Sequence, residues 1–196
     1  MNRAPHRPLL QVIIGSTRPG RVGLPVATWF AQAARQADLF DVEVVDLADI
    51  DLPLLDEPHH PRLRQYVHDH TQAWSETIDR ADAYVFVIPE YNYGFNAATK
   101  NAIDYLHEEW KDKPFGCVSY GGIAAGTRAV QMLKQVLTTL NMVAVFEAVN
   151  IAFIQQQIQE AHFVPNPGNI AAADALVAAL DRWIPATQAL RAAAAV

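Results

Sequence analysis

The residues with the clearest chemical potential lie in the segment GSTRPGRVG, from Gly15 to Gly23. Hydroxyls and guanidinium groups alternate there with glycines, and both groups suit phosphate oxygens. The four side chains are Ser16, Thr17, Arg18 and Arg21. A loop that leads into a helix adds outward-facing amides and a partial positive charge. The segment therefore predicts an anion site; the alternative is an ordinary turn whose arginines are merely solvated.

Two sharper motifs do not fit this loop. The dinucleotide fingerprint G-x-G-x-x-G needs a second glycine where Thr17 stands. A Walker A loop needs lysine and a hydroxyl after its second glycine, and Arg21 and Val22 occupy those places. A magnesium-bound triphosphate is therefore not expected.

Two further loops carry unusual residues. PEYNYGF, over 89–95, offers backbone amides and aromatic faces against which a flat heterocycle could lie. SYGGIAAG, over 119–126, contains Gly121 and Gly122, which allow the backbone to approach a ring edge closely. A phosphate site, a flat ring and no device for magnesium together describe flavin mononucleotide (FMN).

The elements that must position these loops alternate along the chain. The apolar run 9–14 predicts a strand buried on both faces. Further strands are expected at 42–46, 83–88, 115–120 and 142–146, separated by helices with apolar residues at helical spacing. We expect these helices near 22–38, around 66–78, from an N-cap at Asn96 to about 107, over 130–140, and over 170–184, where Pro185 should end the last one.

This alternation predicts an α/β fold: a doubly wound, five-stranded parallel sheet with the flavodoxin-like order 2-1-3-4-5 and helices on both faces. Ligands bind such sheets beyond the carboxyl ends of the strands. The three unusual loops all follow strands at that edge, so we expect them to converge on one rim.

Bulk properties agree with this interpretation. The 196 residues, about half of them apolar, fit one domain over 1–196. A net charge of −6 argues against nucleic acid or an anionic membrane surface as partners. A lone cysteine, Cys117, and the lack of a long apolar run favour a cytoplasmic location.

The motifs GSTRPGR, PEYNYG, KNAIDYL (100–106) and SYGG followed by GTRAV resemble the NAD(P)H-dependent FMN reductase family, which has a flavodoxin-like fold. The resemblance implies that the first loop holds the FMN phosphate, the second cradles the isoalloxazine and the third borders its pyrimidine edge. The residues concerned are Ser16, Thr17, Arg18, Arg21, Val22, Gly23, Pro89, Glu90, Tyr91, Asn92, Ser119, Tyr120, Gly121 and Gly122. One departure from the family pattern is Arg21-Val22-Gly23, where Ser-x-Asn is frequent.

The resemblance also implies an activity and an assembly. Hydride passes from NADPH or NADH to FMN, and electrons then pass to a flavin, quinone, azo compound or similar acceptor in a ping-pong cycle. No side chain is needed as a catalytic proton donor. A homodimer or homotetramer is implied. The alternative function is a flavodoxin-type electron carrier without nicotinamide-dependent turnover.

A metal site is not expected, although one part of the chain has metal-like composition. These residues are Asp56, Glu57, His59, His60, His68 and His70. No H-x-x-x-H or thiolate spacing occurs among them, and His68 and His70 would lie on different faces of a helix. We expect a solvated surface. Residues 146–165, with their run of glutamines, fit no pattern and could form an arm toward a partner subunit.

Overall fold

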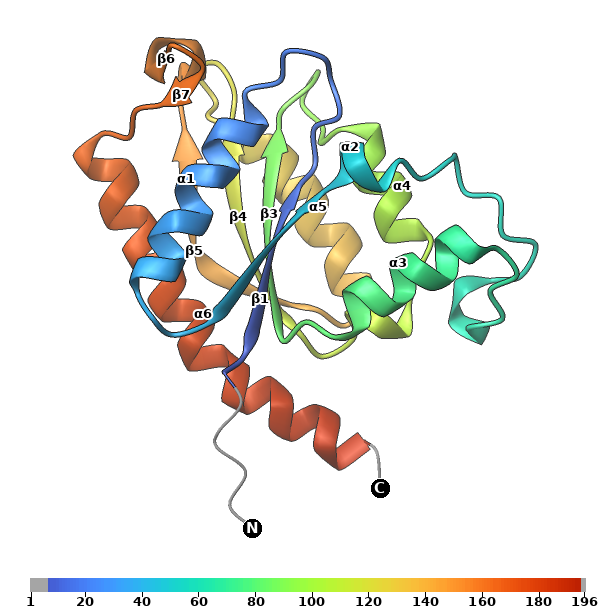
Figure 1. The fold of residues 1–196 in the computed structure, drawn as a ribbon. Coiled ribbons are helices and arrows are strands. Elements are labelled where there is room, and N and C mark those ends of the chain that lie inside the picture. Colours follow the sequence, from blue (N-terminus) through green and yellow to red (C-terminus); the bar gives the residue numbers. More distant parts are fainter. Residues whose placement is uncertain (1–6, 195–196) are drawn as a thin grey trace.

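A computed structural model of the chain describes residues 7–194. Five strands form one sheet in the order β2-β1-β3-β4-β5, and every neighbouring pair is parallel (Figure 1). Their bounds are β1 (Leu9–Ile14), β2 (Asp41–Asp46), β3 (Ala83–Pro89), β4 (Pro114–Tyr120) and β5 (Val143–Ile151). The predicted fold class and strand order are confirmed. The expectation of one domain over 1–196 stays a prediction.

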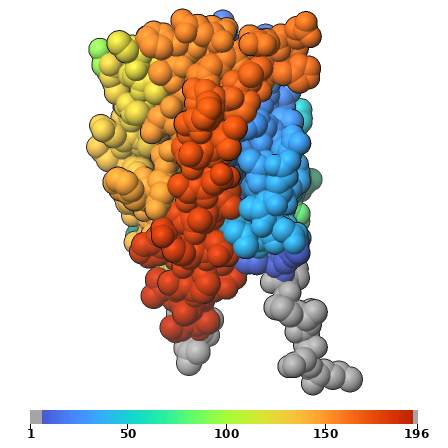
Figure 2. All heavy atoms as spheres, turned by 90° about the vertical axis from the view of Figure 1, so that its left-hand side faces the viewer, coloured from blue at the N-terminus to red at the C-terminus, as the bar shows by residue number. Residues whose placement is uncertain are grey.

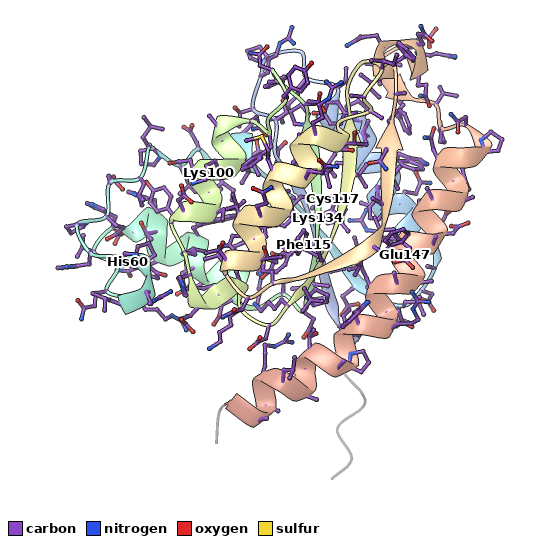
Figure 3. All side chains as sticks on the ribbon, turned by 180° about the vertical axis from the view of Figure 1, so that it is seen from behind. His60, Lys100, Phe115, Cys117, Lys134 and Glu147 are labelled. Carbon is purple, nitrogen blue, oxygen red and sulfur yellow. The ribbon has the colours of Figure 1, made fainter. Side chains whose placement is uncertain are left out.

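Helices cover both faces of the sheet. On one face lie α1 (Gly23–Gln36) and α6 (Pro167–Ala194), side by side in Figure 2 and in one apolar cluster with the sheet. On the other lie α3 (Asp69–Asp79), α4 (Ala97–Asp104) and α5 (Thr127–Thr139). Figure 3 shows the molecule from behind, with Lys100 on α4 and Lys134 on α5. The two apolar layers hold the strand ends in place.

The central strands are the most deeply buried part of the fold. Every residue of β3 and β4 is buried, and so is β1 apart from Leu9. Cys117 in β4 lies within the second apolar cluster, and burial raises the pKa of its thiol to about 12. The thiol is thus a small core group that stays protonated at neutral pH.

The last helix differs from the prediction, because Pro185 does not end it. Helix α6 continues through this proline to Ala194. Proline removes one helical hydrogen bond, but contacts at the base of the sheet fix the following turns. Arg191 donates to the carbonyl of Asp112 (2.8 Å) and pairs with Asp82 (3.0 Å), which also accepts from Gln188 (2.9 Å). Tertiary contacts therefore override the local signal.

Smaller differences concern the ends of elements. The helix expected around 66–78 begins at Asp69, the helix after Asn96 ends at Asp104, and β5 extends to Ile151. Short elements fill the connections: α2 (Leu47–Ile50), η1 (Pro61–Leu63), η2 (Glu108–Trp110), η3 (Ile154–Gln157), β6 (Ile158–Gln159) and β7 (His162–Phe163). Within residues 7–194, no helix is both long enough and apolar enough to cross a bilayer.

Candidate functional site

The three loops singled out in the sequence meet at the carboxyl edge of the sheet. They line a hollow of about 140 Å³ between the ends of β1, β3 and β4. Its lining comprises Ser16, Arg18, Gly20, Arg21, Val22, Pro89, Glu90, Tyr91, Tyr120, Gly121, Ile154 and Gln155. Most of the predicted site residues are therefore brought together. Thr17, Gly23, Asn92, Ser119 and Gly122 are not in the lining.

The first loop presents hydrogen-bond donors at the start of α1. The first bond within this helix runs from the Val26 N–H to the Val22 carbonyl (3.4 Å). The N–H groups of Gly23 and Leu24 precede it and need partners from outside the helix. Ser16 is buried beside them, with its Oγ 3.3 Å from the Tyr91 hydroxyl. This end of the hollow is suited to an anion.

The two arginines of this loop have different surroundings. Arg21 donates to the Ser16 carbonyl (2.9 Å) and pairs with the Asp46 carboxylate at the end of β2. Its backbone N–H donates to Arg18 (3.1 Å). Within the described chain, Arg18 is exposed and has no ion-pair partner. Arg21 therefore holds the loop together, and Arg18 is the guanidinium left available to a ligand.

The second loop makes a tight turn. The N–H of Tyr91 donates to the Gly94 carbonyl (2.9 Å), and the Gly94 N–H donates back (2.9 Å). Asn92 (φ 51°) and Tyr93 (φ 71°) occupy the left-handed positions at the tip. Such backbone is uncommon for a residue as large as tyrosine. The turn places Tyr91 in the hollow and keeps Asn92 outside its lining.

The Glu90 carboxylate is held by Arg128. Its carboxylate accepts from the Arg128 side chain (3.0 Å) and from the Arg128 backbone N–H (3.1 Å) near the start of α5. The same guanidinium lies 4.1 Å from the ring centroid of Tyr93. Glu90 therefore connects the second loop to α5, and its carboxylate is occupied.

The third loop is held in shape by buried hydrogen bonds and close packing. The Ser119 hydroxyl, fully buried, donates to the Ala125 carbonyl (2.8 Å). A Cβ on Gly126 would come within 2.7 Å of the Ser119 side chain, so only glycine fits there. The Gly121 N–H donates to Ile151 (3.2 Å) and is not free for a ligand. Ser119 therefore shapes the loop and does not face the hollow.

The segment after β5 completes the rim, and sequence reasoning missed it. The Ile154 N–H donates to the Gly121 carbonyl (3.1 Å), and the Phe153 N–H donates to Gly122 (3.1 Å). Ile154 and Gln155 thereby line the hollow. The sequence signal that pointed here was weak, because the apolar pattern of β5 was followed only to Phe146, whereas the strand runs on to Ile151.

Thr17 faces a neighbouring hollow. This second space, about 320 Å³, lies between the first loop, α2 and α4. Its other lining residues are Leu47, Ala48, Asp51, Leu52, Ala98, Asn101 and Ala102. Thr17 thus lines a different hollow from Ser16, Arg18 and Arg21.

The metal-like residues form hydrogen bonds among themselves. The rings of His68 and His70 stack with centroids 5.1 Å apart. The expectation that they lie on different faces of a helix does not apply, because α3 begins at Asp69. His68 precedes α3 with extended backbone, which turns its ring toward His70. His70 contacts the Asp56 carboxylate (3.0 Å). Among residues 7–194, no three His, Cys, Asp or Glu side chains are placed to hold a metal ion.

The donor set of the hollow fits a flavin phosphate. A serine hydroxyl, an unpaired guanidinium and the amides of a helix N-terminus surround one end. A Cβ on Gly23 would come within 2.6 Å of the Tyr120 hydroxyl, so the glycine keeps this corner open. That hydroxyl is buried and has no hydrogen-bond partner in the described chain. The site has the donors and the space that a phosphate needs.

Comparison with known proteins identifies the class. The profile of the NADPH-dependent FMN reductase family matches residues 8–156. An NAD(P)H-dependent FMN reductase of Schizosaccharomyces pombe is 44% identical over 137 residues, covering 69% of this chain and 68% of that protein. One from Saccharomyces cerevisiae is 37% identical over 142 residues, covering 67% and 74%.

Solved structures agree on the fold. The flavoenzyme NAD(P)H:acceptor oxidoreductase FerB of Paracoccus denitrificans superimposes with a TM-score of 0.73 at 20% identity, covering 92% of this chain and 98% of that one. At this identity the likeness shows the α/β fold alone. With the family match and the two yeast relatives, the chain belongs to the NADPH-dependent FMN reductase family and is an NAD(P)H-dependent oxidoreductase.

Proposed function

We propose that the protein binds FMN across the three-loop rim, with its phosphate at the N-terminus of α1 and its ring beside Pro89, Tyr91 and the Gly121 loop. The observation that carries this proposal is the shared hollow, which joins an anion site to aromatic and glycine-rich backbone. Of the two arginines predicted to bind phosphate, Arg18 is the one whose guanidinium has no ion-pair partner among residues 7–194. A bound FMN supplies the hydride chemistry, between NADPH or NADH and a small-molecule acceptor.

The chain's own residues bind the cofactor and orient its ring. Ser16, Arg18 and the Gly23 amide fix the phosphate, and this fixes the position of the attached ring. Pro89 and Tyr91 border the ring, and the Gly121 and Gly122 backbone borders its pyrimidine edge. The Gly121 N–H itself is occupied by the Ile151 carbonyl. No side chain of the lining is needed as a proton donor, so we assign no catalytic residue. The nicotinamide leaves before the acceptor enters, which gives ping-pong kinetics.

The acceptor is proposed to be a flavin, quinone, azo compound or similar molecule. The curated relatives include NADPH:quinone oxidoreductases and an FMN-dependent NADPH-azoreductase. We propose a homodimer or homotetramer in the cytoplasm. Exposed apolar side chains of the segment between α2 and α3, namely Leu54, Leu63 and Val67, support association. The buried, unpaired Cys117 supports a reducing compartment.

The test is a visible spectrum of the purified protein, followed by anaerobic titration with NADPH and NADH. Bound flavin should absorb at about 370 and 450 nm and should bleach on addition of one of these donors. Flavin absorption without bleaching would instead favour a flavodoxin-type electron carrier. A colourless protein that does not bind added FMN would refute the proposal.

A further inference from the structure

Tyr120 differs from the other site residues because its buried hydroxyl makes no hydrogen bond within the described chain. The residue ends β4 and is 4% exposed. Its phenolic oxygen has no hydrogen-bond partner within the described residues. Buried polar atoms are nearly always paired, so an orphaned one at a binding site indicates a missing partner. Burial also raises the pKa of this phenol, so the group is a hydrogen-bond donor at neutral pH.

The backbone and the side chain of Tyr120 contact different loops of the site. Its backbone carbonyl accepts from the Glu90 N–H (3.1 Å), at the second loop. Its hydroxyl lies beside the first loop, because a Cβ on Gly23 would meet it at 2.6 Å and would meet the Ser16 Cβ at 3.6 Å. The ring therefore extends from the glycine loop to the start of α1.

Ser16 connects this hydroxyl to the hollow. Serine has one proton to donate and can accept from two other donors. Once Ser16 donates to a phosphate oxygen, its oxygen becomes a better acceptor for the neighbouring phenols. Tyr91, with its hydroxyl 3.3 Å away, is one of them. Tyr120 is the other: its hydroxyl is close enough to Ser16 for that side chain to lower the pKa of the phenol, although no well-formed hydrogen bond joins the two within the described residues.

We propose that Tyr120 is a positioning residue for the phosphate end of the cofactor, and that through Ser16 it makes the protein select phosphorylated flavin over riboflavin. This inference rests on the proposed function. It differs from the family resemblance, which places the whole segment 119–122 at the pyrimidine edge. The Gly121 and Gly122 backbone stays with the ring, and the Tyr120 side chain serves the phosphate.

The experiment measures flavin affinity of the apoprotein by fluorescence quenching, with FMN and with riboflavin, for the wild type and for Tyr120→Phe. The variant should raise the Kd for FMN about tenfold, since the lost hydrogen bond supports a charged group. The Kd for riboflavin should change less than about twofold. Tyr84→Phe is the matched control: that ring is also fully buried, but its hydroxyl bonds to Ile78, away from the site.

Stability of the apoprotein separates this role from a merely structural one. Because the hydroxyl is unpaired before binding, Tyr120→Phe should leave the thermal midpoint of the apoprotein unchanged or higher, while Tyr84→Phe should lower it. FMN should then raise the midpoint of Tyr120→Phe less than it raises that of the wild type.

A second variant tests the geometry. Gly23→Ala places a methyl group against the Tyr120 hydroxyl, so FMN affinity should fall. Combining it with Tyr120→Phe should relieve that contact, because the nearest remaining ring atom would lie 3.4 Å away.

Three results would overturn the inference about Tyr120: equal losses for FMN and riboflavin, no loss for either, or a less stable Tyr120→Phe apoprotein. A wild-type protein that binds neither flavin would instead overturn the proposed function itself.

Discussion

The side-chain amide of Asn96 donates to the backbone carbonyl of Gly15 at 2.6 Å, although the residues are 81 positions apart. The bond ties the loop after β3 to the loop after β1, the two loops at the point where the strand order reverses. Thr99 donates to the other end of the same amide (2.8 Å). The N-cap position predicted for Asn96 is correct, but the side chain does not cap its helix. It holds the rim together.

Replacing Asn96 should therefore destabilise the protein. Asn96→Ala leaves the Gly15 carbonyl and the Thr99 hydroxyl without their partner in a buried setting, at a cost of about 1–3 kcal/mol. The free energy of unfolding, from urea titration, measures this loss. Gln131→Ala, on the exposed face of α5, is the control and should change it by less than about 0.5 kcal/mol. Equal stabilities would show that the bond between the loops contributes nothing.

The two arginines of the first loop should respond differently to alanine. Arg18→Ala should weaken FMN binding by about 1.5–3 kcal/mol, the scale of a charge-assisted hydrogen bond. Arg21→Ala should chiefly lower stability, because it removes the ion-pair partner of Asp46 and the donor to the Ser16 carbonyl. Flavin titration and urea unfolding of both variants separate the two effects. Unchanged FMN affinity in Arg18→Ala would refute its role as a phosphate ligand.

The segment after β5 should matter for both stability and binding. Ile154 is 6% exposed, packs in the cluster shared by α1 and α6, and bonds to Gly121 through its backbone. Ile154→Ala should cost about 2–4 kcal/mol of stability through the cavity it creates, and it should loosen the flavin. Ile123→Ala, at an 80% exposed position of the third loop, is the control. If both substitutions change the free energy of unfolding equally, Ile154 does not have the packing role proposed here.

Lys113 should make stability depend on pH. The ammonium is buried at the end of α3, where it donates to the carbonyls of Ile78 (3.1 Å) and Asp79 (2.8 Å) and contacts the Tyr84 hydroxyl (3.2 Å). Burial lowers its pKa from 10.5 to about 8. Between these values the unfolded chain binds the proton and the native chain does not, so stability rises with pH in that interval.

The full rise attributable to Lys113 is roughly 3 kcal/mol, at about 1.4 kcal/mol for each pKa unit. Lys113→Met removes the titrating group and serves as the reference. Urea unfolding of both proteins at pH 8 and pH 10 should show the wild type gaining stability relative to the variant. If the difference in unfolding free energy between the two proteins is the same at both pH values, the pKa of Lys113 is not lowered by folding.

Much of the fold follows from local patterns. The apolar runs of β1, β3 and β4 are buried on both faces, and such runs are typical of central parallel strands. Gly15, Pro89 and Gly121 predicted where the loops after β1, β3 and β4 begin. The rule that parallel strands end at one edge then brought Arg18, Tyr91 and Gly121 to a single hollow, as the structure has them.

The tertiary structure decided what each side chain does there. No local pattern reveals that Asp46 occupies Arg21, that Arg128 occupies Glu90, or that Ile154 reaches back to Gly121. The same limit applies to Pro185, which local propensity treats as a helix end and which the packing of α6 tolerates. Periodicity and turn chemistry depend on neighbours within a few residues, so the sequence by itself determined the strands, their order and the edge that binds. Pairing between distant groups depends on three-dimensional distance, so only the folded chain decided which donors remain free for a ligand.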